Sequence, residues 1–196
     1  MGAGSDSRTP VNDFLARIHA ELGIPATYAV SCGMPLQAEC DRLVDAGLDV
    51  FGRPARLEAG TWLAWQAMQA RAAQDGVLLQ LISAYRSYEY QQQLIARKLA
   101  RGQRITDILK VNAAPGFSEH HSGRAVDIGT PGCEHLEEVF ENSDAFAWLS
   151  AHARDFGFRL SFPRDNPWGV LYEPWHWYCE GMNHSITGPS TQASDF

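Results

Sequence analysis

The sequence predicts a single domain of the mixed α+β class. Apolar residues recur at helical spacing in several segments, other apolar runs have only the length of strands, and no internal repeat or break in composition divides the 196 residues. With 45% hydrophobic and 20% charged residues, the chain has the composition of an ordinary globular protein. A domain of this length buries roughly 70% of the surface of its unfolded chain, so its core can hold a polar site without disulfides.

The helices are predicted from apolar positions three or four residues apart and from glycine stop signals. Thr61 can cap one of them, and Ser143 or Asp144 can cap another. The four longer helices are expected at residues 11–22, 61–75, 88–100 and 143–156. Between residues 26 and 60 the pattern is irregular and rich in glycine and proline, which predicts loops around one short helix near residues 37–46.

Strands are predicted from short apolar or alternating runs. Residues 77–83 form an apolar run too short for a helix, which indicates a buried strand that delivers residues 84–87 to a site. Residues 124–128 alternate between polar and apolar side chains, as a half-buried strand does. Two further short strands around residues 158–162 and 170–178 complete the α+β pattern.

The domain is expected to have three parts. Residues 61–182 form the core that carries the motifs described below, and residues 1–60 form a helical and irregular extension packed on the same domain. Residues 183–196 are polar and without periodicity, which predicts a flexible tail. The extension can cover a cleft, mediate self-association or complete the core, and the sequence leaves these roles and the oligomeric state open.

Charge and composition argue against several classes of partner. The formal net charge is −7 and no dense Lys/Arg cluster is present, so a nucleic-acid partner is not expected. No stretch approaches the roughly 18 apolar residues of a membrane span, and no export signal is recognisable. The location expected by default is therefore the cytoplasm, or the cell envelope if a signal was removed from a precursor.

The four cysteines do not indicate a metal or redox motif. They form no CxxC pair, which argues against a zinc finger or a thioredoxin-like site. Free thiols are the simpler expectation, and one or two disulfides are the alternative. The residues concerned are Cys32, Cys40, Cys133 and Cys179.

Two segments carry residues that can bind a metal ion and hydrolyse an amide. A catalytic zinc site uses three protein ligands and leaves a fourth position to water. His120, Asp127 and His176 can supply the ligands. Glu173, which Pro174 biases toward an extended or turn conformation, is then free to act as base. Spacing alone does not distinguish this set from hydrogen-bonded core residues, so the neighbouring residues decide.

Those neighbours form three ordered motifs. The pattern Ser-x-His-x-x-Gly-x-Ala-x-Asp is matched by Ser118, His120, Gly123, Ala125 and Asp127. The pattern Glu-x-Trp-His is matched by Glu173, Trp175 and His176. A Ser-x-Tyr-Arg-Ser turn followed by glutamine is matched by Ser83, Tyr85, Arg86, Ser87 and Gln91. Over roughly residues 62–178 the chain therefore resembles the zinc D-alanyl-D-alanine carboxypeptidases and dipeptidases of the VanY and VanX kind, and the VanY-like carboxypeptidases most closely.

The resemblance implies both a fold and the centre of the site. The fold is a short antiparallel sheet flanked by helices, like that of hedgehog domains and D-Ala-D-Ala peptidases, with one zinc ion in a central cleft between the strands of the first two motifs. His120, Asp127 and His176 are implied as zinc ligands and Glu173 as catalytic base. Arg86 is implied to stabilise the oxyanion.

The resemblance also implies how substrate is held. Ser118 and Gln91 would contact the terminal D-alanine, and Trp175 would shape the pocket beside the metal. A cap or turn role for Ser118, a solvated helix face for Gln91 and a core position for Trp175 remain alternatives. His121 is expected at the cleft rim. Phe162 stands before a proline where many carboxypeptidase members have tyrosine, which leaves the substrate preference open.

The function implied is removal of the C-terminal D-alanine from a peptidoglycan stem peptide or precursor. Alternatives within the family are cleavage of free D-Ala-D-Ala dipeptide and cleavage of an internal L-Ala-D-Glu bond. A non-catalytic zinc module, as in hedgehog domains, is an alternative of another class, and an adaptor role is a third. The presence of both Glu173 and Arg86 favours an enzyme.

Overall fold

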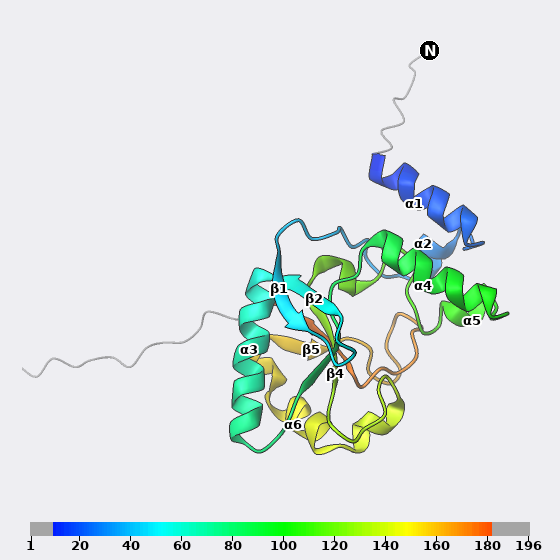
Figure 1. The fold of residues 1–196 in the computed structure, drawn as a ribbon. Coiled ribbons are helices and arrows are strands. Elements are labelled where there is room, and N and C mark those ends of the chain that lie inside the picture. Colours follow the sequence, from blue (N-terminus) through cyan, green and yellow to red (C-terminus); the bar gives the residue numbers. More distant parts are fainter. Residues whose placement is uncertain (1–9, 182–196) are drawn as a thin grey trace, which may run out of the picture.

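The computed structural model describes residues 10–181 (Figure 1), so the predicted tail, residues 183–196, lies outside the described part of the chain. The helices are α1 (Pro10–Glu21), α2 (Tyr28–Ser31), α3 (Ala59–Gln74), α4 (Tyr88–Ala100), α5 (Ile105–Ile108) and α6 (Asp144–His152). Short 3-10 turns are η1 (Glu119–Ser122), η2 (Glu138–Asn142) and η3 (Ala153–Phe156). The strands are β1 (Leu43–Leu48), β2 (Pro54–Glu58), β3 (Gln80–Ser83), β4 (Ala125–Gly129), β5 (Phe158–Leu160) and β6 (His176–Cys179). The predicted α+β class is confirmed.

A four-stranded antiparallel sheet forms the centre of the domain. Its strand order is β3-β4-β6-β5, and every residue of β4 is buried. Ser83 of β3 and His176 of β6 both lie opposite Asp127 of β4 in the register. Because paired positions across antiparallel strands are close neighbours, this register alone places Asp127 and His176 together.

Four of the predicted helices are confirmed, but the cap predicted at Thr61 is wrong, because α3 begins at Ala59 and the side chain of Glu58 accepts a hydrogen bond from the backbone N–H of Thr61. Residues 11–22, 61–75 and 88–100 correspond to α1, α3 and α4, and residues 143–156 correspond to α6 followed by η3. The side chain of Ser87 accepts a hydrogen bond from the backbone N–H of Tyr90, and Ser143 does the same for Phe146. These are N-caps, which satisfy backbone donors that have no partner within the helix.

The helix predicted near residues 37–46 is wrong. Residues 43–48 instead form β1, which pairs antiparallel with β2 through Leu43 opposite Glu58 and Val44 opposite Leu57. The pairing places Ala46, Ala55 and the fully buried Leu57 in the core. Tertiary packing of this hairpin therefore overrides the weak local helical preference.

The last predicted strand is also shorter than expected. Residues 170–178 were predicted as a strand, but β6 begins only at His176. Before it, the backbone N–H of His176 bonds to the carbonyl of Glu173 in a turn around Pro174. The N–H of Glu173 bonds to the carbonyl of Phe162. This turn holds Glu173 at the end of the sheet rather than within it.

The buried apolar residues form two separate cores. One lies between the sheets, α3 and α6 and includes Trp65, Met68 and Trp177. The other is built by α1, α2, α4 and α5. In Figure 1, α3 lies on one side of the strands and the group α1, α4 and α5 lies on the other. Residues in or beside the motifs belong to both cores, Ala84 and Val126 to the first and Tyr88 and Phe117 to the second.

The extension that precedes the hairpin packs on the second core. Leu15 and Ile18 of α1 share this core with Ile95 of α4. The approach is close, since a Cβ atom on Gly116 would lie 2.7 Å from Leu15 Cδ1. The backbone N–H of Gln37 also donates to the carbonyl of Gly116 at 2.7 Å. These contacts tie residues 10–40 to the segment that leads into the first motif.

Two findings bear on the expectations from composition. All four cysteines are unpaired in the structure, in agreement with the simpler of the two expectations. Among residues 10–181, none of the helices combines the length and the apolar character that a membrane crossing requires.

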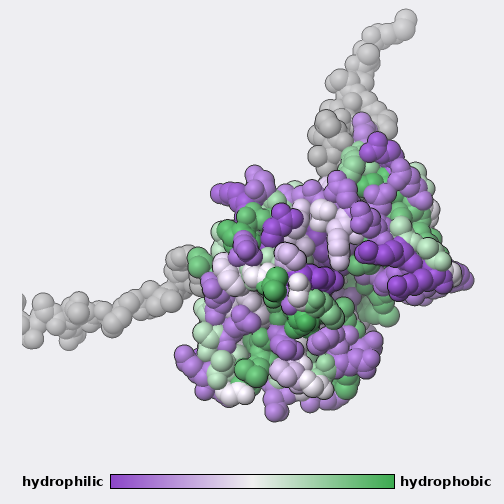
Figure 2. Space-filling model, viewed as in Figure 1, coloured by the Kyte–Doolittle hydropathy of each residue, from purple (hydrophilic) through white to green (hydrophobic). Residues whose placement is uncertain are grey.

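On the face seen in Figure 2, hydrophilic and hydrophobic residues are interspersed, and strongly hydrophilic residues gather around α5 and the neighbouring end of α4.

Candidate metal centre

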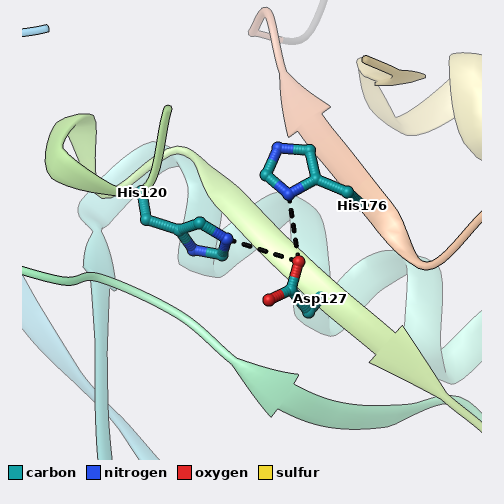
Figure 3. Close-up of side chains that lie close together, drawn as sticks. All are labelled: His120, Asp127 and His176. Atoms are coloured by element: carbon teal, nitrogen blue, oxygen red, sulfur yellow. Dashed lines mark hydrogen bonds and ion pairs between the residues drawn. The ribbon is translucent and has the colours of Figure 1, made fainter. Parts of the chain in front are cut away.

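Three predicted ligands converge from three different segments. His120 lies on the turn η1, Asp127 on β4 and His176 at the start of β6, and the two imidazoles point toward the Asp127 carboxylate (Figure 3). All three side chains are buried, with 1% to 4% of each residue exposed. One ligand atom from each residue lies within 4.8 Å of the others. The structure thus brings together the ligand set predicted from the sequence.

A glycine makes the turn that carries His120 possible. Gly123 ends η1 with a φ of 68°, which is unfavourable for residues with a side chain. A Cβ atom at this position would lie 2.9 Å from the backbone nitrogen of Glu58 and 2.9 Å from Leu43 Cδ2. The glycine of the first motif therefore permits a close approach of the backbone.

Each imidazole is oriented by a hydrogen bond on the nitrogen away from Asp127. His120 Nδ1 lies 2.6 Å from the carbonyl oxygen of Ala84, which can only accept, so Nδ1 carries the proton. Among the described residues, His120 Nε2 is buried without a hydrogen-bond partner, and it lies 3.3 Å from Asp127 Oδ1. His176 Nδ1 lies 3.0 Å from the same oxygen. An unpartnered buried nitrogen beside a carboxylate is the arrangement that a cation would satisfy.

The charges of the cluster support the same conclusion. Burial, followed by the charge of Arg86, lowers the pKa of His120 to about 4, so this imidazole is neutral and able to ligate. Burial opposes the charge of Asp127, but His120 and His176 outweigh it and hold the pKa of Asp127 well below its ordinary value. Burial also opposes the charge of His176, but bonds to Asp127 and Glu119 raise its pKa to about 10. A metal ion would replace the proton between His176 and Asp127.

Glu173 lies beside the three ligands without being one of them. One of its carboxylate oxygens is 3.8 Å from His176 Nδ1, and its side chain is 12% exposed. Burial raises the pKa of Glu173 to about 7, and the carboxylates of Asp127 and Glu119 act in the same direction. A carboxyl group with this pKa can both accept and release a proton near neutral pH.

Arg86 supplies a cation on the other side of Asp127. Its Nη2 lies 3.6 Å from Asp127 Oδ2, and its Nη1 donates to Gln91 Oε1 at 3.2 Å. Its Nε is buried without a partner among the described residues. The guanidinium therefore has donors left for an additional acceptor in the cleft.

The predicted substrate residues all line one cleft with a volume of about 670 Å³, together with Arg86, Glu173 and the ligands. Ser118 is 5% exposed and Gln91 is fully buried. Trp175 is partly buried and packs against the first core, so the predicted pocket role and the alternative core role coexist there. The ring of Phe162 lies 4.9 Å from the ring of His176, between centroids, and forms an apolar part of the wall.

A comparison with protein families identifies a family that carries these residues. The family model for VanY, described as D-alanyl-D-alanine carboxypeptidase, matches residues 54–182. The chain belongs to the VanY family. The match includes all three motifs of the cleft.

Relatives and solved structures agree with membership of the VanY family. A D-alanyl-D-alanine carboxypeptidase of Enterococcus faecalis is 32% identical over 121 residues, which are 57% of this chain and 43% of that protein. The structure of the LdcB LD-carboxypeptidase matches with a TM-score of 0.67 and 26% identity, over 76% of this chain and 75% of that one. A mutant of the vancomycin resistance D,D-pentapeptidase VanY, in complex with Zn(II), matches with a TM-score of 0.58 and 28% identity, over 76% and 83%. The chain thus spans less than half the length of the curated relative.

The prediction for His121 is wrong. This residue is fully buried, and its Nε2 accepts a hydrogen bond from the backbone N–H of Gly116 at 3.1 Å. Its Nδ1 donates to the carbonyl of Arg86 at 2.6 Å. Burial lowers its pKa to about 3, so it stays neutral. His121 therefore lies inside the protein, where it holds the backbone of Arg86 by a hydrogen bond, and not at the cleft rim.

Glu119 is a functional candidate that sequence reasoning missed. Its Oε2 accepts hydrogen bonds from Ser161 Oγ at 2.5 Å and from His176 Nε2 at 3.0 Å, and its Oε1 accepts one from Arg159 at 3.0 Å. Burial opposes its charge, but these partners lower the pKa of Glu119 to about 2. A carboxylate that holds the far nitrogen of a metal-binding histidine fixes its tautomer. The signal available in the sequence was an acidic residue directly before His120.

Proposed function

We propose that this chain is a zinc-dependent D,D-carboxypeptidase that removes the terminal D-alanine from peptidoglycan stem peptides or their precursors. The observation that carries the proposal is the convergence of His120, Asp127 and His176 in one cleft with Glu173 and Arg86 beside them. Membership of the VanY family supports the reaction class, and the zinc in the VanY structure supports the choice of metal.

The residues present fit one zinc ion. His120 through Nε2, Asp127 through Oδ1 and His176 through Nδ1 would hold it, because these atoms face one another while the other ring nitrogens are engaged by Ala84 and Glu119. Two nitrogens and one carboxylate oxygen are a usual ligand set of catalytic zinc. Zinc, when bound, polarises a carbonyl oxygen and lowers the pKa of a water molecule toward about 7.

The remaining chemistry falls to two side chains. Glu173 accepts a proton from the water that attacks the scissile carbonyl carbon, and it then delivers that proton to the leaving amine as the C–N bond breaks. Arg86, whose buried Nε has no partner within residues 10–181, stabilises the negative charge that develops on the carbonyl oxygen. The partial burial of both residues excludes bulk water, which strengthens these interactions.

A second candidate is an L,D-carboxypeptidase. The match to the LdcB LD-carboxypeptidase, with its TM-score of 0.67, favours it. Such an enzyme would remove D-alanine from a tetrapeptide, where the preceding residue has the L configuration. Cleavage of free dipeptide or of an internal L-Ala-D-Glu bond are the family alternatives, and a zinc module without activity is the alternative of another class.

Product identification distinguishes these candidates. The zinc-loaded chain is incubated with a pentapeptide ending in D-Ala-D-Ala, a tetrapeptide ending in one D-alanine, and free D-Ala-D-Ala, each with and without a chelator, and the products are identified by mass spectrometry. We expect chelator-sensitive loss of one alanine from the pentapeptide. Loss from the tetrapeptide alone would replace the proposal with the L,D activity, and cleavage of the dipeptide alone would replace it with a dipeptidase.

The Glu173→Gln variant tests whether the zinc centre is catalytic. We expect it to retain zinc, because Glu173 is not a ligand, and to lose at least a hundredfold in turnover, as is usual when a general base is removed. A variant with full zinc and full turnover would refute the role of Glu173. A wild-type protein that binds zinc and cuts none of the three peptides would favour the non-catalytic module.

A further inference from the structure

One wall of the cleft presents hydrogen-bond donors that have no acidic partner. Lys98 lies on the same face of α4 as Gln91, two turns later, and both residues line the cleft. Among residues 10–181, no carboxylate lies within ion-pair distance of the Lys98 ammonium. Its hydrogen-bond partner is Asn112 Oδ1, at 2.5 Å. A partly buried ammonium without a carboxylate at contact distance keeps donors free for a molecule in the cleft.

Asn112 and Ser118 add donors to the same wall. An ammonium can only donate, so the Asn112 amide turns its oxygen toward Lys98 and its NH₂ group away. Within the described part of the chain, neither this NH₂ group nor the hydroxyl of Ser118 forms a hydrogen bond with protein, although both residues line the cleft. The wall therefore offers an ammonium, an amide and a hydroxyl to a molecule in the cleft.

Gln91 is poorly placed for the same purpose, because it is fully buried and each end of its amide already has a protein partner. The residue is 0% exposed. Its Oε1 accepts from Arg86 and its Nε2 donates to the carbonyl of Ala113 at 2.8 Å. Gln91 therefore positions Arg86, and recognition of the substrate's end falls to other residues of this wall.

The local charges favour an anion at this place. Burial lowers the pKa of Lys98 and the positive charge of Arg86 lowers it further, whereas the negative charge of Glu173 raises it. Two cations thus face one part of the cleft; of the carboxylates there, Asp127 belongs to the predicted metal ligands, and Glu173 is not within ion-pair distance of Lys98 in the described part of the chain. A carboxylate placed against Lys98 would relieve this repulsion through charge-assisted hydrogen bonds, which are about twice as strong as neutral ones.

We propose that Lys98, together with Asn112, binds the free C-terminal carboxylate of the peptide substrate. This inference rests on the proposed function and adds the group that restricts the reaction to the end of a chain. The ligand class is a peptide acid, as opposed to a peptide amide or an internal peptide segment, neither of which brings an anion to this wall. The chain is accordingly an exopeptidase, and cleavage of an internal L-Ala-D-Glu bond is disfavoured.

A binding experiment tests the inference without depending on turnover. The zinc-loaded chain carrying Glu173→Gln is titrated calorimetrically with N-acetyl-D-Ala-D-Ala and with the same peptide as its C-terminal carboxamide. We expect the acid to bind at least about tenfold more tightly than the amide. Lys98→Met in this background should weaken binding of the acid about tenfold to hundredfold and leave binding of the amide nearly unchanged. Lys98→Arg, which keeps the charge, should retain most of the preference.

Matched controls make the outcome decisive. Lys110 is exposed and pairs with Asp107, so Lys110→Met should leave both affinities unchanged. Thermal melting confirms that the Lys98 variants are folded. Equal binding of acid and amide, no binding of either, or an acid preference that survives Lys98→Met would overturn the inference. Peptide acids that bind through Lys98 but are not cut by the wild type would refute the proposed function alone. A rate of hydrolysis that does not change with the Lys98 substitutions would refute the inference alone.

Discussion

Removal of the Glu119 carboxylate tests how the metal centre is organised. Glu119 touches one of the two imidazoles, His176, through a hydrogen bond of 3.0 Å, whereas His120 is fixed by the carbonyl of Ala84. Partners of this kind typically contribute tenfold to hundredfold to metal affinity. This range corresponds to about 1.4–2.7 kcal/mol. We expect Glu119→Ala to weaken zinc binding by that factor, and Glu119→Gln, which keeps an acceptor but loses the charge, to weaken it less.

The assay is competition for zinc against a chromophoric chelator, with the visible absorption of the Co(II)-substituted protein as a second readout of ligand geometry. Glu180→Gln is the matched control, because Glu180 binds the same Arg159 at 2.8 Å while its carboxylate has no contact with His176. Melting of the metal-free proteins separates loss of affinity from loss of fold. If Glu119→Ala binds zinc within about twofold of wild type, with an unchanged Co(II) spectrum, the assigned role is wrong.

Three further predictions concern neighbouring features. Arg86→Met should lower turnover about a hundredfold to a thousandfold while zinc content, measured by atomic absorption, stays unchanged; a matching loss of zinc would contradict an oxyanion role. Gly123→Ala should cost at least about 1 kcal/mol of unfolding free energy in urea, and more than Gly132→Ala, whose φ is +80° but whose Cβ would meet nothing within 4 Å. Burial raises the pKa of Tyr28 from 10.0 to about 12, so the unfolded chain ionises first and stability falls as pH rises from about 10 toward 12. Tyr28→Phe should remove up to about 1.4 kcal/mol of that alkaline loss by pH 11, measured by urea unfolding between pH 8 and 11, and an unchanged pH dependence would contradict it.

The parts of the fold that the sequence predicts correctly have their determinants close together in the chain. For α4, the cap at Ser87, the periodic apolar positions and the Arg101-Gly102 ending all lie within or beside the helix. The hairpin β1–β2 has no such local signature. Its stability depends on pairing and on burial of Leu57 against α3 residues of the first core. Because these contacts exist only in the folded protein, the local pattern suggested a helix instead.

The same distinction applies to the site. The ligands are predictable because residue type and motif spacing are both visible in the chain. Glu119 is not, because its partners Arg159 and Ser161 lie 40 and 42 positions away. His121 was misjudged because successive residues of a 3-10 turn point about 120° apart. His120 therefore faces the cleft, while His121 faces inward and packs against the Tyr88 ring at 4.7 Å.

The two cores support different walls of the cleft. Asp127 and His176 stand on the sheet, whose strands are packed by the first core, so the metal ligands depend on that half of the molecule. Gln91 and Lys98 stand on α4, which the second core holds through Ile95 together with Leu15 and Ile18 of α1. The first 53 residues lie outside the family match, yet α1 and the segment after it complete the core behind the wall that we assign to the substrate carboxylate. Variation in this extension is therefore expected to alter peptide recognition before it alters metal binding.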